Sequence, residues 1–99
     1  MQIARTGSRE ISITGNIKTT DDYLAIRRMA QDLVEEGVTA ITFLIDASLS
    51  MPSSVIGYFV KLVKRDKIAL RMVIEDPRLL ELLEELGLKD AFGAVGKTA

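Results

Sequence analysis

Two adjacent serines, Ser53 and Ser54, are the residues of this chain best placed to do chemistry. They lie in the stretch FLIDASLSMPSSVIGYFVKLV, which runs from Phe43 to Val63. This stretch begins as an apolar strand, breaks at a serine-rich turn and continues with the spacing of an amphipathic helix. Free backbone N–H groups and the positive end of the helix dipole favour a phosphate group at a helix start. The pattern therefore predicts a small binding module with a serine that can carry phosphate.

Enzyme chemistry has little support in the composition, because the 99 residues include no His and no Cys. The chain therefore lacks the usual general base, the usual nucleophile–base pairs and the soft metal ligands. Glu81, Glu84 and Glu85 are expected on the solvated side of a helix, with no partner acid on another element. We predict no catalytic residue, no metal and no cofactor.

Two further patterns have weaker support. Residues 91–98, AFGAVGKT, fit a loose phosphate-binding loop, but no helix is predicted after them, so we interpret the match as chance. Asp46, near the end of a predicted strand, resembles the phospho-acceptor of response-regulator receivers. The pair Asp21-Asp22 resembles the acidic pair that holds magnesium in those receivers. That pair does not directly follow a strand, and only three helices are predicted where a receiver has five. We expect Asp46 to be a turn or capping acid and the pair to lie in a first helical turn.

The bulk composition predicts one domain over residues 1–99 with a single hydrophobic core. Hydrophobic residues make up 47% of the chain and charged residues 27%, which is typical of a soluble globular protein. The net charge of −1 provides no basic surface for nucleic acid or anionic lipid. No run has the length of a membrane-spanning helix and no signal-peptide core is recognisable. We expect a cytoplasmic protein without membrane insertion.

The elements that precede the serine pair are a β-hairpin and a helix. Residues 2–6 and 9–14 flank a Gly-Ser turn, and the second of these segments alternates apolar and polar residues. The helix is expected to start at Thr19 or Thr20, either of which can cap it, and to stop at Gly37.

The rest of the chain predicts strands that alternate with helices. In order these are a strand at 40–47, a helix at 53–65, a strand at 68–74, a helix opened by Asp76-Pro77 and closed by Gly87-Leu88, and a short strand at 92–95. The first strand is continuously apolar, which predicts cover on both faces. Gly57 costs helix propensity, which predicts a close backbone contact at this residue. The order β-β-α-β-α-β-α-β predicts an α/β fold with a mixed sheet and helical cover.

The helix that starts at the serines also predicts a binding surface. Helical spacing places Ser54, Tyr58, Lys61 and Arg65 on one exposed face, and an aromatic side chain between long cations is typical of a protein-binding patch. With Ser53 added, these are the predicted partner-binding residues. The plainer interpretation is that Ser53 or Ser54 only caps the helix and that Tyr58 is an ordinary half-exposed residue.

Three stretches of the chain resemble the STAS domain, the fold of bacterial anti-sigma factor antagonists. ITGNIKTTDDYLAIRRMAQDLVEEG is similar to the family's opening strand, loop and helix. MPSSVIG aligns without a gap on the family's switch motif, Asp-Ser-Ser-Gly-Leu-Gly, and RLLELLEELGLKDAF is similar to its closing helix. The resemblance extends over residues 11–92 and implies a STAS-like mixed β-sheet with helices.

The resemblance also implies a function, that of an anti-sigma factor antagonist in a partner-switching system. In that family a serine kinase of the GHKL ATPase type, which also serves as anti-sigma factor, phosphorylates the second serine of the motif. The matching residue here is Ser54, with Ser53 as the alternative. The unphosphorylated antagonist binds the kinase and frees the sigma factor. The phosphorylated form releases the kinase until a phosphatase resets it.

Two departures from the motif favour a second interpretation. Pro52 stands where the family usually has Asp, and Val55 where it usually has Gly. The family's acid helps to order the loop of the phosphorylated serine. Some STAS modules are never phosphorylated and act as constant binding subunits, for example in ABC-type lipid transport complexes. An unphosphorylated binding or scaffold subunit is therefore the alternative function.

Overall fold

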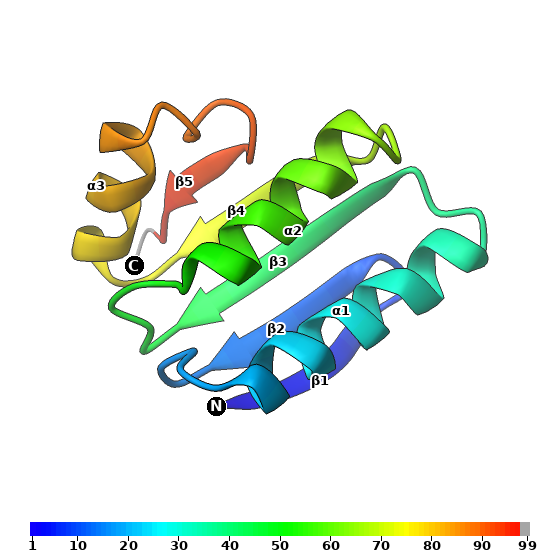
Figure 1. The fold of residues 1–99 in the computed structure, drawn as a ribbon, viewed down its shortest axis with the longest axis horizontal. Coiled ribbons are helices and arrows are strands. Elements are labelled where there is room, and N and C mark those ends of the chain that lie inside the picture. Colours follow the sequence, from blue (N-terminus) through cyan, green and yellow to red (C-terminus); the bar gives the residue numbers. More distant parts are fainter. Residues whose placement is uncertain (98–99) are drawn as a thin grey trace.

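The computed structural model describes residues 1–97, which form five strands and three helices (Figure 1). Their bounds are β1 Gln2–Gly7, β2 Glu10–Thr14, α1 Thr20–Glu35, β3 Ala40–Asp46, α2 Ser53–Lys64, β4 Ala69–Ile74, α3 Pro77–Glu85 and β5 Ala94–Gly96. The order confirms the predicted α/β class. The hairpin turn lies at Ser8 and Arg9, one residue later than predicted, because β1 continues through Gly7.

One mixed sheet carries all five strands of the described chain, in the order β1-β2-β3-β4-β5. The hairpin strand β1 is antiparallel to β2, and β2 to β5 are parallel to one another. The parallel part follows from the helices, because a parallel pair needs a crossover connection of a dozen or more residues. The predicted mixed sheet with helical cover is confirmed.

The helices cover one face of this sheet, because each new parallel strand is added on the same side of the previous one. Right-handed crossovers that all advance in one direction place their helices on one face. Figure 1 shows α1 and α2 across the same side of the sheet. A Cβ on Gly96, the partner of the core residue Ile74, would lie 3.5 Å from Leu80, so α3 packs on this side too.

The expectation that residues 40–47 are covered on both faces is therefore wrong. Ile41, Phe43 and Ile45 point to the helices and are buried, whereas the residues between them, Leu44 among them, are only half-buried. The sequence is apolar on both sides of β3, but only one side meets helices.

The hydrophobic core lies between the sheet and the helices. Aromatic side chains form its centre, since the ring of Phe59 in α2 lies 4.9 Å from that of Phe43 in β3 and 5.8 Å from that of Phe92. All three phenylalanines are fully buried. Edge-to-face pairs of this kind add to the stabilisation that apolar burial provides.

Local capping signals bound α1 and α3 where the sequence predicts. Thr19 caps α1 and exchanges hydrogen bonds with Asp22 in a capping box, and Asp76 caps α3 ahead of Pro77. Gly87 has a φ of +72°, and the N–H of Leu88 donates to the carbonyl of Leu83 at 2.9 Å, as in a Schellman motif.

The stretch that resembles a phosphate-binding loop has a different structure. Its residues up to Lys97 form a turn and then β5, and Thr98 lies outside the described residues. Lys97 pairs with Asp46 at 3.1 Å. Within residues 1–97, no helix combines the length and the apolar character that crossing a bilayer requires.

Candidate functional site

The loop that leads into α2 is held by the neighbouring loop after β2. The hydroxyl of Ser48, which is 1% exposed, donates to the carbonyl of Gly15 at 2.6 Å. The N–H of Leu49 donates to Oδ1 of Asn16 at 3.1 Å. Ala47, at the end of β3, adopts a left-handed φ of +57° that turns the chain out of the sheet. These contacts fix where α2 begins.

The predicted serine pair lies in the first turn of α2, and both serines are exposed. Pro52 is the N-cap residue, so the interpretation that Ser53 or Ser54 caps the helix is wrong. The carbonyl of Pro52 accepts from the N–H groups of Val55 and Ile56. The preceding N–H groups, those of the two serines, have no carbonyl partner within the helix, as in any first turn.

Among the described residues no side chain caps α2, although side chains cap α1 and α3. Pro52 carries neither a hydroxyl nor a carboxylate, and the first turn of α2 contains no acidic residue. The positive end of this helix dipole is therefore not neutralised by the helix itself. The same end carries the hydroxyl groups of two exposed serines, Ser53 and Ser54.

Tyr58 does not belong to the exposed face on which the sequence prediction placed it. Its side chain is only 4% exposed, and its ring packs edge-on against Tyr23 of α1 at 6.4 Å. Val55, Tyr58, Phe59 and Leu62 follow the i, i+3, i+4, i+7 spacing of a buried helix face. This spacing could have identified Tyr58 as a core residue in advance.

The hydroxyl of Tyr58 has no hydrogen-bond partner among the described residues. Burial, which disfavours the charged phenolate, raises the pKa of this side chain above its ordinary value, and the carboxylate of Asp66 acts in the same direction. The residue therefore stays neutral and contributes packing between α1 and α2.

The exposed stripe of α2 consists of Ser53, Ser54, Gly57, Lys61, Lys64 and Arg65. A Cβ added to Gly57 would meet nothing within 4 Å, so the predicted close backbone contact at this residue is wrong. Gly57 instead leaves the helix surface without a side chain between the two serines and the basic residues. Arg65 pairs with its neighbour Asp66 at 3.3 Å. The stripe thus joins hydroxyl groups to a basic helix end.

The acidic residues considered for a receiver-type site have structural roles. The carboxylate of Asp22 accepts the N–H groups of Lys18 and Thr19 in the α1 cap, at 2.9 and 3.2 Å. Asp46 forms its ion pair with Lys97, so it is not the turn or capping acid that we expected. Within residues 1–97, no group of three or more acidic side chains could hold a metal ion.

No known protein-family model matches this sequence, and no curated protein matches it.

Proposed function

We propose that this chain is a protein-binding module whose partner contacts the exposed stripe of α2 and is controlled by phosphorylation of Ser54. The proposed class is the STAS-type anti-sigma factor antagonist. The observation that carries the proposal is the exposed, uncapped serine pair at the start of α2. The motif MPSSVIG supports it, because its second serine is the one that the family phosphorylates.

A phosphate on Ser54 suits the helix that carries it. It adds about −1.5 to −2 charges and three strong acceptor oxygens, next to N–H groups that have no carbonyl partner. The helix dipole favours negative charge at this end, so phosphorylation leaves the fold intact. Phosphorylation therefore changes the charge of the α2 surface. A partner that fits two hydroxyl groups and a basic helix end would contact a doubly charged phosphate group instead.

Gly57 adds a second supporting observation. A glycine inside a helix lowers stability by about 0.5–1 kcal/mol relative to alanine. No contact within residues 1–97 explains this cost, since the space beside Gly57 is open. A partner whose backbone or side chain approaches α2 closely would explain it. The STAS switch motif has glycine at the matching position.

The partners in this proposal are a GHKL-type serine kinase that also serves as anti-sigma factor, and a phosphatase that removes the phosphate. The domain acts by binding and performs no catalysis of its own. Its location in this proposal is the cytoplasm, where sigma factors act.

The test is phosphate mapping after incubation with the cognate GHKL-type kinase and Mg-ATP. We expect one phosphate on Ser54, its loss in Ser54→Ala, and its retention in the matched control Ser53→Ala. We also expect the phosphorylated protein to lose its affinity for the kinase. Absence of phosphate from both serines would overturn the switch.

A specific observation favours the alternative, an unphosphorylated scaffold subunit such as that of an ABC-type lipid transport complex. Pro52 occupies the N-cap of α2 without a side-chain acceptor, and Val55 is fully buried. The loop therefore lacks the acid that orders the serine in the family. This alternative predicts a stable complex whose affinity is unchanged by Ser54→Asp, and a loss of binding in that variant would exclude it.

A further inference from the structure

The face of the sheet opposite the helices has a regular pattern of residue types. Its central row runs across the strands through Ala4, Ser12, Leu44, Val73 and Val95, which are register partners of one another. The rows on either side of it are mainly polar. Val95 is 43% exposed and is one of few large apolar side chains so exposed in the described chain. This open face is a candidate interaction surface.

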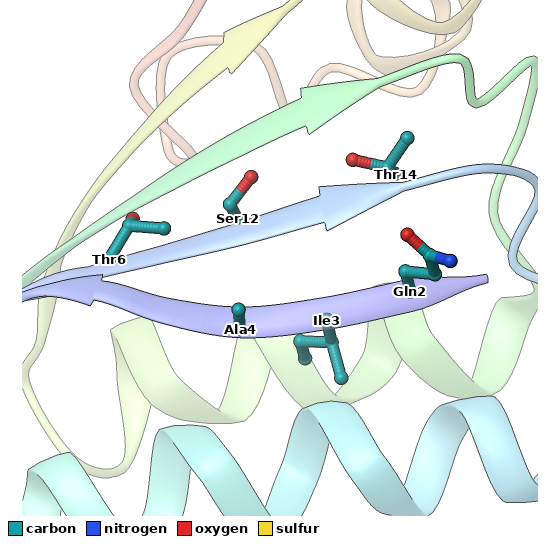
Figure 2. A pocket seen from close by; sticks show the side chains of 6 residues that line it. All are labelled: Gln2, Ile3, Ala4, Thr6, Ser12 and Thr14. Atoms are coloured by element: carbon teal, nitrogen blue, oxygen red, sulfur yellow. The ribbon is translucent and has the colours of Figure 1, made fainter.

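The open face has a hollow on one side of β3 and larger apolar side chains on the other. A hollow of about 450 Å³ lies over β1 and β2, lined by Gln2, Ile3, Ala4, Thr6, Ser12 and Thr14. Figure 2 shows Ile3 pointing toward the helices, whereas Ala4, Ser12 and Thr14 lie on the side away from them. On the other side of β3, the same central row carries the larger apolar side chains of Val73 and Val95, which are called the ridge below. The short side chains therefore lie on one half of the row and the larger ones on the other.

We propose that the open face binds a second copy of this chain, with a two-fold axis along β3. Such an axis exchanges β2 with β4 and β1 with β5. It places Val73 over Ser12 of the second copy, and Val95 over Ala4, so each ridge enters the other copy's hollow. Two sheets packed in this way lie about 10 Å apart with strands within about 30° of each other.

The charges on the open face agree with the same axis. Glu10 on β2 and Arg71 on β4 flank Thr42 in one row, two strands apart, so the axis exchanges their positions. Each Glu10 then faces Arg71 of the other copy. Arg71 is exposed and forms no ion pair with another residue of the described chain. On the axis, Asp46 meets its own copy, and Lys97 pairs with each Asp46 at 3.1 Å. The exposed Glu75 lies beside Asp46, so acidic side chains gather at this end of the axis.

The size of the open face predicts a weak dimer. Five strands at about 4.8 Å spacing, with a mean length of about 18 Å because β5 is short, cover roughly 430 Å² per copy. The total of roughly 850 Å² is in the range of weak, transient contacts, so we expect association in the micromolar range or weaker. This interface lies opposite the stripe of α2, so it is independent of the proposed switch and leaves both stripes free.

A charge exchange tests the proposed axis. Sedimentation at increasing concentration is expected to show the wild-type chain moving from 10.9 kDa toward twice that mass. Glu10→Arg and Arg71→Glu each place like charges together at two sites, so each should weaken self-association by at least about tenfold. The double variant restores opposite charges and should recover the dimer. A double variant as weak as the singles would overturn the proposed axis.

An exposed apolar residue on another surface provides the matched control. Val95→Glu should abolish the dimer, because it places a charge inside the second copy's hollow. Leu86→Glu, at a residue that is 51% exposed beyond α3, should leave the dimer unchanged. Circular dichroism verifies that each variant is folded. A wild-type chain that remains a monomer at millimolar concentration, or that dimerises equally well with Val95→Glu, would refute the second copy as occupant.

Discussion

At the scale of the residue, Tyr58 is the predicted partner-binding residue that the structure places in the core. Its ring belongs to the core between α1 and α2, while its hydroxyl has no partner in the described chain. A buried hydroxyl without a hydrogen bond costs about 1–3 kcal/mol. We therefore predict that Tyr58→Phe leaves the protein as stable or makes it more stable by about 1 kcal/mol, measured by urea unfolding.

The same variant separates two roles for this residue. A core residue can be changed to Phe without altering the α2 surface, so partner binding should be unchanged. The control is Tyr23→Phe, which removes the hydroxyl of the half-buried ring that packs against Tyr58. A marked loss of partner affinity in Tyr58→Phe alone would contradict this and indicate that the Tyr58 hydroxyl takes part in partner binding.

Among the described glycines, Gly93 has the least room for a side chain. Its φ is +56°, and a Cβ would approach the carbonyl of Leu70 closely and lie 3.2 Å from the Cα of Arg71. Both obstacles are backbone atoms of β4, which cannot shift without breaking the sheet. Gly93→Ala should therefore lower the free energy of unfolding by at least about 2 kcal/mol, measured by thermal unfolding.

At the scale of the element, α2 differs from the other helices in its N-terminal end. A negative charge there should stabilise it, because the end has no side-chain cap and no acid. We predict that Ser54→Asp raises the free energy of unfolding by about 0.3–1 kcal/mol at low salt. Ser54→Asn has similar size without the charge and should give little of this gain. A gain that does not shrink as salt is added would contradict the electrostatic cause.

Gly57 allows a second prediction about α2. Its φ is helical and the space beside it is open, so Gly57→Ala should raise the free energy of unfolding by about 0.5–1 kcal/mol. Gly37→Ala is the matched control, since its Cβ also meets nothing within 4 Å but its φ is +88°. That variant should be destabilised. If a partner approaches α2 at Gly57, then Gly57→Ala should bind that partner more weakly although it is more stable, as titration calorimetry would show.

At the scale of the whole molecule, hydrogen-bonded carboxylates predict sensitivity to acid. The N–H of Lys18 lowers the pKa of Asp22, and Arg5 and Arg78 lower the pKa values of Glu36 and Asp76. The unfolded chain therefore takes up protons at higher pH than the folded chain does. The stability that these three carboxylates contribute is fully present above their ordinary pKa values, 3.8 for Asp and 4.5 for Glu. This contribution is lost as the pH falls through the lowered pKa values of the folded protein.

The measurement is the free energy of unfolding between pH 6 and pH 3, a range set by these ordinary carboxyl values. Asp22→Asn should begin less stable at pH 6, because the capping box is damaged, and should lose less stability on acidification. Asp21→Asn removes a neighbouring carboxylate that makes no cap hydrogen bond and serves as control. Equal acid losses in the wild type and in Asp22→Asn would contradict the assignment.

The topology of the whole molecule also limits where a site can be. In an open parallel sheet, ligands usually bind at a point where the strand order reverses and helices leave on opposite faces. The strand order here never reverses, so the described chain has no such crevice. The surfaces left for function are the exposed stripe of α2 on one side and the open sheet face on the other, and both suit macromolecular partners.

The sequence by itself determined the features that depend on near neighbours in the chain. Thr19 and Asp76 cap their helices through hydrogen bonds to residues three and two positions further along the chain. Gly87 ends a helix because glycine adopts positive φ readily. Element order follows from periodicity and from these stops. The periodicity also places the start of α2 at Ser53, although no side chain of the described residues caps that helix.

Only the tertiary structure decided which faces of those elements are covered. An apolar β3 is compatible with cover on one face or on two, and the common direction of the crossovers leaves Leu44 half-buried. Tyr58 is buried because α1 lies beside α2. The space beside Gly57 is open because no other part of the described chain packs against this residue. These outcomes come from contacts between residues far apart in the chain, which local spacing does not encode.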